Sequence, residues 1–104
     1  TRFLLMGDAE KEEEHDLIES GADLSAEVLK IGHHGSSTST TDALLNAVKP
    51  TWAAISVAGD SNGLPKKEVL KRLLSAGAAV YRTDVSGTLI FMSDGQNIKI
   101  ATGR

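Results

Sequence analysis

The chain alternates short apolar runs with stretches of helical period, and this alternation limits the folds open to it more than any other feature. A short apolar run between turn-forming residues is typical of a strand, whereas apolar residues three and four positions apart indicate a helix. Strands are expected at residues 2–7, 26–32, 51–58, 78–83, 87–93 and 97–102, and helices at residues 9–20, 39–48 and 66–76. Such alternation predicts a sheet covered by helices.

The order of these elements predicts an α/β fold in a single domain over residues 1–104. We expect a mixed sheet with about three helices on one face. The other face would be solvated or packed on something absent from this chain. Because Thr1 lies directly in the first expected strand, we expect the chain to be a fragment of a longer protein.

Two helix starts have sequence signals. Asp8 stands at a natural N-cap position before the first expected helix. Ser39 and Asp42 have the spacing of a capping box at the start of the second. Both signals predict where the strand-to-helix connections end.

The charge and the cysteine content exclude several classes of protein. The net charge of -3 argues against a broad nucleic-acid surface, which is usually basic. The absence of cysteine excludes disulfides and thiolate metal sites, and no apolar run approaches the ~20 residues of a membrane helix. Acidic residues gather between Asp8 and Glu19, and basic ones between Lys66 and Arg72. We expect both clusters to be solvated helix faces.

A histidine pair, His33 and His34, follows the second expected strand in the stretch KIGHHGSSTST, and Asp8 follows the first strand in the same way. If the two strands are parallel neighbours, the carboxylate and one imidazole meet at the carboxyl edge of the sheet, where α/β proteins usually bind ligands. Asp and His supply the oxygen and nitrogen ligands that suit zinc, manganese or iron. A helix cap and a surface histidine pair in a turn are the structural alternatives.

For the neighbouring polar residues, both a functional and a structural interpretation are open. Adjacent residues on an extended chain point to opposite sides, so His33 and His34 are not expected to bind one ion together. One would bind metal while the other contacts substrate or acts as an acid. Ser36 is either a donor to a phosphate oxygen or part of the loop before a helix. Lys30 either balances an anionic substrate or is an exposed strand lysine, and His15 is expected on the solvated helix face.

Five motifs, in order, carry a resemblance over almost the whole chain. They are LLMGDAE, EVLKIGHHGSSTST, AAISVAGDSNG, EVLKRL and VYRTDVSGTL. Together they resemble the C-terminal half of the metallo-β-lactamase-fold domain of ComEC-type DNA internalization competence proteins. The resemblance implies half of a four-layer αββα sandwich, with a dimetal site between two similar halves. It also implies a parent in the bacterial cell membrane that takes up transforming DNA, and a soluble, extracytoplasmic domain that hydrolyses the strand not imported.

The resemblance also implies roles for particular residues. Asp8 matches the bridging metal carboxylate, and His34 matches a metal-ligand histidine, with His33 as the other choice. The remaining histidine, Ser36 and Lys30 would face the phosphate. The implied cofactor is a divalent metal, zinc or manganese, held by the complete domain and weakly or not at all by this chain alone. The implied partners are DNA or another phosphodiester, the missing N-terminal half of the domain, and the membrane channel part of the parent. Because the missing half would leave an apolar sheet face exposed, we also expect self-association with a second copy of this chain.

Two departures from the family pattern leave other functions open. The family's H-x-H-x-D-H cluster is absent, since no histidine precedes His15, and Asn62 and Leu64 stand where relatives have the Tyr and His of a YGHP run. Asp8 and one histidine do not complete a catalytic zinc site, which takes three protein ligands and water. We therefore expect part of a hydrolase site. The alternatives are a degenerate, non-catalytic module that packs on the channel or binds DNA, and a secreted phosphoesterase of the same fold.

Overall fold

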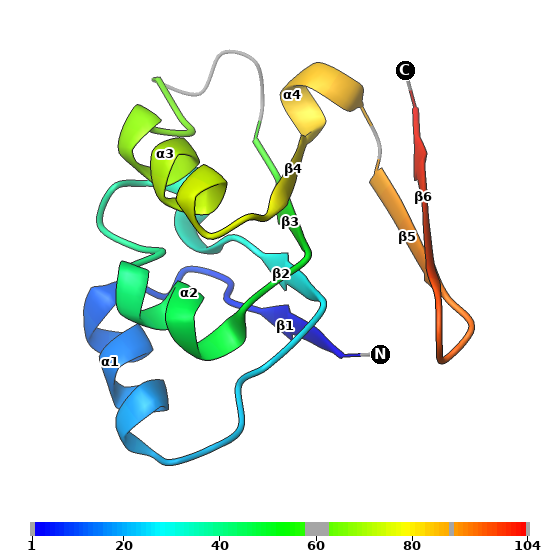
Figure 1. The fold of residues 1–104 in the computed structure, drawn as a ribbon. Helices are drawn as coiled ribbons and strands as arrows, with labels where there is room; N and C mark the ends of the chain where they lie inside the picture. Colours follow the sequence, from blue (N-terminus) through cyan, green and yellow to red (C-terminus); the bar gives the residue numbers. More distant parts are fainter. Residues whose placement is uncertain (1, 58–62, 88, 104) are drawn as a thin grey trace.

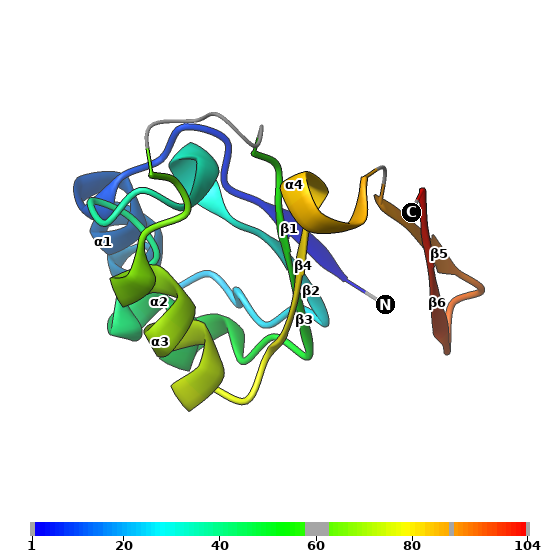
Figure 2. The same cartoon turned by 90° about the horizontal axis from the view of Figure 1, so that it is seen from above.

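A four-stranded parallel sheet forms the centre of the molecule. The computed structural model describes residues 2–57, 63–87 and 89–103. The sheet strands, in their order across the sheet, are β1 (Phe3–Leu5), β2 (Val28–Lys30), β3 (Trp52–Ile55) and β4 (Ala79–Arg82). They are connected by α1 (Lys11–Glu19), α2 (Asp42–Val48) and α3 (Lys67–Ser75). All three helices lie on one face of the sheet (Figures 1 and 2), as expected when right-handed crossovers add each strand on the same side of the last.

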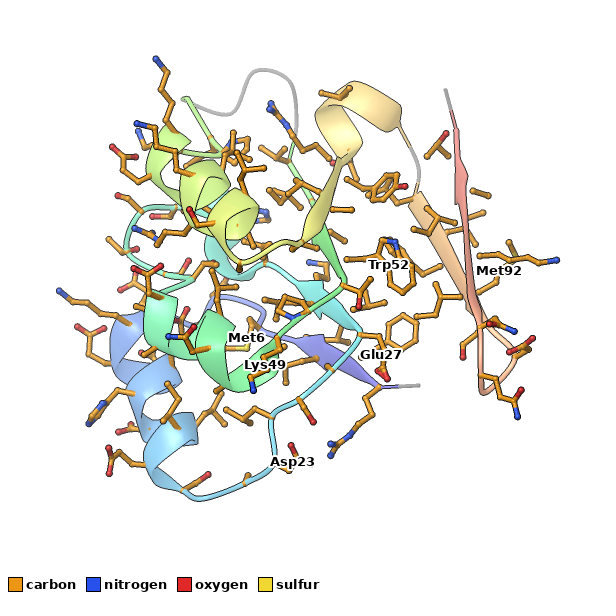
Figure 3. The ribbon with its side chains drawn as sticks, viewed as in Figure 1. Met6, Asp23, Glu27, Lys49, Trp52 and Met92 are labelled. Atoms are coloured by element: carbon orange, nitrogen blue, oxygen red, sulfur yellow. The ribbon has the colours of Figure 1, made fainter. Side chains whose placement is uncertain are left out.

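The remaining elements extend the chain beyond the sheet. A single 3₁₀ turn, η1 (Gly32–Gly35), follows β2, and a short helix, α4 (Thr83–Ser86), follows β4. The last two strands, β5 (Leu89–Ser93) and β6 (Ile98–Thr102), pair as an antiparallel hairpin. Figure 2 shows this hairpin on the side of the sheet opposite the helices. In Figure 3, Trp52 lies between the sheet and the hairpin, and Met92 lies toward the hairpin's outer side.

The core lies between the sheet and the helices. Side chains on a strand alternate between the two faces of a sheet, and Ala53 and Ile55 of β3 are accordingly buried while Trp52 and Ala54 are only half-buried. The fully buried side chains that meet in this layer include Leu29, Ile31, Leu44, Val48, Ile55, Val69 and Leu73. Within the described ranges, no helix is both long enough and apolar enough to cross a membrane.

The α/β fold class expected from the sequence is confirmed. Helices cover one face, and the chain contains both parallel and antiparallel strands. The antiparallel pair forms a sheet of its own, because α4, where only a turn was expected, leads the chain out of the parallel sheet (Figure 1). The hairpin covers part of the face opposite the helices, but Leu5 is still 69% exposed and Phe3 43% exposed on β1.

Two helix starts differ from the expectations. The residue before α1 is Glu10, so Asp8 is not its N-cap and lies instead in the turn after β1. The N-cap of α2 is Thr41, whose hydroxyl oxygen accepts a hydrogen bond from the amide of Leu44 (3.2 Å). Ser39 does not cap this helix, because its hydroxyl donates within the preceding loop. Both connections are therefore longer than the sequence signals predicted.

Candidate functional site

The segments after β1 and β2 meet at the carboxyl edge of the parallel sheet. The two strands are parallel neighbours, with Leu5 opposite Lys30 in the register. The contact is close at Gly32, where a Cβ atom would lie 3.0 Å from the carbonyl oxygen of Ala9 and 3.1 Å from Cβ of Met6. The turn that carries Asp8 therefore packs on the start of η1, and the Asp8 side chain is exposed at this edge.

His34 is held in one orientation by the next strand. Its Nδ1 atom lies 2.6 Å from the carbonyl oxygen of Ser56, just beyond β3. A carbonyl oxygen only accepts hydrogen bonds, so Nδ1 carries the hydrogen and, in the neutral ring, Nε2 keeps its lone pair. The His34 side chain is exposed, which leaves Nε2 accessible. A backbone carbonyl on the other ring nitrogen is the usual support of a metal-binding histidine, and it suits a base equally well.

The turn after His34 requires a glycine. Gly35 has a φ of 85°, and a Cβ atom there would lie 2.4 Å from Cβ of Pro65. Its carbonyl oxygen accepts a hydrogen bond from the amide of Lys66 (2.9 Å). His34 itself has a φ of 54°, in the left-handed region that few residues other than glycine adopt. The start of α3 therefore packs directly on the histidine turn.

A buried carboxylate from α1 fastens the end of the same loop. Glu14 is 1% exposed, and it accepts hydrogen bonds from the amides of Thr40 and Thr41 and from the Thr41 hydroxyl. Thr40 has a φ of 59°, which is strained for a β-branched residue. The carboxylate therefore holds the loop in a backbone shape that it would otherwise rarely adopt.

An arginine from α3 fastens the loop from the other side. Arg72 donates from Nε to the carbonyl oxygen of Thr40 (2.8 Å) and from Nη2 to that of Ser39 (3.2 Å). The fully buried Ser39 hydroxyl lies 3.1 Å from the carbonyl oxygen of Gly32 and 3.2 Å from that of Ser36. These bonds connect the two ends of the loop, so Glu14 and Arg72 help to set the shape of the histidine turn.

Glu14 and Arg72 were both expected on solvated helix faces, and that expectation is wrong for each. The acidic and basic clusters are long runs of like charge, and nothing in their spacing marks one member as buried. The only available signal is that Glu14 lies four residues after Glu10 and three before Leu17, on the side of α1 that turns toward the core.

Ser36 and Lys30 lie on different sides of the candidate site. The Ser36 hydroxyl is 2.9 Å from that of Thr38, which in turn donates to a carboxylate oxygen of Glu10 (3.2 Å). Lys30 instead lines a pocket of about 410 Å³ between the sheet and the hairpin, together with Ser56 and other residues. The structure therefore brings Asp8 and the His34 turn to one edge, but it directs Ser36 toward α1 and Lys30 toward the hairpin.

The described residues do not form a complete metal site. His34 offers one nitrogen and Asp8 one carboxylate, and no group of three or more ligand side chains occurs among the residues that the structure describes. The side chain of His33 and all of Asn62 lie outside those residues. Leu64, where the resemblance implies a histidine in relatives, is half-buried and packs against the hydrophobic core. The Asp8 carboxylate and the His34 nitrogen are the kinds of ligand that bind a metal. They are too few to complete a metal site.

Comparison with known proteins identifies relatives of this α/β domain, which has polar residues at the carboxyl edge of its sheet. The chain is 39% identical over 89 residues to ComE operon protein 3 of Bacillus subtilis, 40% over 92 residues to competence protein ComA of Neisseria gonorrhoeae, and 42% over 86 residues to recombination protein 2 of Haemophilus influenzae. These matches cover 84%, 86% and 81% of this chain. No family model matches the chain, and no solved structure matches it significantly.

The chain is homologous to one segment of the ComEC-type competence proteins, which confirms the resemblance seen in the sequence. The segment is a small one, because the matches cover only 11%, 13% and 10% of the three relatives. The similarity therefore shows homology to one segment of these proteins.

Proposed function

We propose that this chain is part of a metal-dependent phosphodiesterase or nuclease-like domain of a bacterial DNA-uptake protein. In this proposal the complete domain degrades the strand that is not imported, on the outer side of the cell membrane. Homology to proteins named for competence and recombination supports a role in handling DNA. The membrane channel and the segment preceding this chain are the proposed partners within the same parent.

The orientation of His34 is the observation that carries the chemical part of the proposal. The Ser56 carbonyl fixes the tautomer in which Nε2 is free, at an exposed position beside the turn that holds Asp8. A backbone carbonyl that takes the hydrogen of one ring nitrogen leaves the other nitrogen in the form that a metal ligand or a base requires. His34 is thus prepared either to ligate a cation or to accept a proton.

Asp8 and His34 would hold the metal, which is zinc or manganese by their ligand chemistry. When bound, such an ion lowers the pKa of its water and stabilises the charge that develops on a phosphoryl oxygen. Lys30 would contribute positive charge from the pocket side. His33 and Ser36 are proposed to contact the phosphate, with the Ser36 hydroxyl exchanging its bond to Thr38 for one to the substrate. The remaining ligands would come from outside this chain.

A non-catalytic DNA-binding or channel-packing module is the second candidate function. Leu64 favours it, because its half-buried side chain packs against the core and has no nitrogen to act as an acid, base or ligand where the resemblance implies a catalytic histidine. The incomplete ligand set among the described residues agrees with either candidate, since another segment can complete it.

Nuclease activity of the longer protein that contains this chain tests the proposal. With manganese or zinc added, Asp8→Ala or His34→Ala should each lower cleavage by a hundredfold or more, since electrostatic contributions of about 3 kcal/mol are typical for such groups. His15→Ala is the control, because this residue is exposed on α1, where its Nε2 atom lies 4.0 Å from a carboxylate oxygen of Glu19. Metal binding by the isolated chain, followed by calorimetry, should be weak. Full activity of a folded Asp8→Ala variant would contradict the metal assignment and favour the non-catalytic module.

A further inference from the structure

Three lysines of the α3 region lie beside the histidine turn. Lys66 is the N-cap of α3, and its amide binds the carbonyl oxygen of Gly35 at 2.9 Å. Lys67 and Lys71 are exposed and four residues apart, so they share one side of the helix. The helix buries Val69 and Leu73 against the core, which leaves the lysines on its outer side. Glu68 is also exposed in the first turn of α3, so the candidate site is continuous with a helix surface on which three lysines outnumber one carboxylate.

The placement of these lysines is unfavourable for the chain alone. Lys66 and Lys67 lie at the N-terminal end of α3, where the helix dipole disfavours positive charge. Lys67 and Lys71 form a like-charge pair at i and i+4. Among the described residues, the ion pairs join Arg2 to Asp23 and His15 to Glu19, and they include none of the three lysines. An anionic ligand would offset all of these costs.

We infer that the lysine surface of α3, formed by Lys66, Lys67 and Lys71, binds the sugar–phosphate backbone of a nucleic acid strand next to the candidate site. This inference rests on the proposed function, because that function requires a phosphodiester at the edge marked by His34. Lys67 and Lys71 are separated by about 6 Å along the helix axis, so they can contact successive phosphates of an extended strand. Arg72 is not part of this surface, since its guanidinium is bound to the loop carbonyls.

The charge on α1 favours a strand over a membrane as the ligand. α1, α2 and α3 lie on the same face of the sheet (Figure 2), and α1 carries the exposed Glu12 and Glu13 in its first turn. A flat anionic membrane that approached α3 would also meet the acidic side chains of α1. A single strand is narrow enough to follow α3 alone.

Binding of a fluorescein-labelled single-stranded oligonucleotide, measured by anisotropy with a chelator present, tests the inference. The variant Lys66→Gln/Lys67→Gln/Lys71→Gln is compared with a matched control, Lys11→Gln/Lys49→Gln/Lys99→Gln, which removes the same charge from exposed lysines elsewhere. The α3 variant should bind about tenfold more weakly, and the slope of its affinity against salt should fall by about 2, for three lost phosphate contacts. The control should stay close to the unaltered chain.

Several outcomes would overturn the inference. These are equal weakening in both triple variants, no weakening in the α3 variant, and no binding by the unaltered chain. Phosphatidylglycerol vesicles form the second arm, and tighter binding to them with the same lysine dependence would assign the surface to a membrane. Circular dichroism checks that both variants fold. Because the chelator prevents any metal-dependent cleavage, this experiment can succeed or fail independently of the test on Asp8 and His34.

Discussion

Helices α1 and α3 both span nine residues and lie on the same face of the sheet, but they are attached in different ways. α3 buries Val69 and Leu73 in the hydrophobic core. The only fully buried side chain of α1 is a carboxylate, Glu14, which is bound to the loop before α2. The difference teaches that the core and the candidate site are stabilised by separate sets of residues, one apolar and one polar.

Both helices also bind the loop before α2. Glu14 binds the amides of Thr40 and Thr41, while Arg72 of α3 binds the carbonyls of Ser39 and Thr40. Amides and carbonyls of the same short segment are thus satisfied by opposite charges from two helices. The loop that ends the histidine motif is consequently fixed by residues distant in sequence.

Truncation of the α3 contact should give the largest loss of stability. Leu73 is 0% exposed, so Leu73→Ala removes apolar contacts and leaves a cavity, at a cost of about 4 kcal/mol. Leu74, which is 78% exposed, is the matched control, and Leu74→Ala should change the free energy of unfolding by less than about 0.5 kcal/mol. Urea denaturation measures both. Equal effects would contradict the apolar attachment of α3.

Loss of the Glu14 contact should lower the free energy of unfolding somewhat less than Leu73→Ala does. It should act mainly on the loop that contains Thr40 and Thr41. Glu14→Ala leaves the buried amide of Thr40 and the half-buried amide and hydroxyl of Thr41 unsatisfied, which should cost about 3 kcal/mol of unfolding free energy. Hydrogen exchange of the Thr40 and Thr41 amides should speed up more than that of amides in the core. Glu13→Ala, at an exposed position on the same helix, is the control and should do neither. Uniform loss of protection throughout the chain would indicate that Glu14 supports the whole fold and not this loop in particular.

The exposed carboxylate of Asp23, which also accepts hydrogen bonds from a hydroxyl and an amide, should have the smallest effect on stability. The Asp23 carboxylate accepts hydrogen bonds from the hydroxyl and amide of Ser25 and from Arg2, and these bonds, the Ser25 hydroxyl first, lower its pKa from 3.8 to about 2. Because the folded pKa is below the unfolded one, the stabilisation is complete above about pH 4 and is lost as the pH falls through about 2. Since Asp23 is exposed, water screens the interaction, and the acid-dependent loss should be small.

An NMR titration of the Asp23 side chain checks this prediction. Ser25→Ala should raise the Asp23 pKa toward 3.8, whereas Ser93→Ala, on the distant hairpin, should leave it unchanged. A normal pKa in the unaltered chain would mean that this carboxylate, unlike Glu14, is not held in place by its neighbours.

Much of the fold was predictable because it follows from periodicity. Each of the six strands and the three longer helices lies within a range expected from apolar spacing. The ends were less predictable, since Asp8 and Ser39 carry the side chains of helix caps but lie in longer connections. The convergence of Asp8 with the histidine turn also followed from the sequence, provided that β1 and β2 were parallel neighbours.

The sequence by itself determined the alternation of strands and helices, the presence of Asp8 and His34 after neighbouring strands, and the homology to competence proteins, because these depend on residue type and spacing along the chain. Only the tertiary structure decided that Glu14 is buried, that Arg72 belongs to the loop and the α3 lysines do not, and that Ser56 selects the His34 tautomer. The physical reason is that a charged run has the same pattern whether one member is solvated or bonded, and the partner that decides the matter lies at least 22 residues away in sequence.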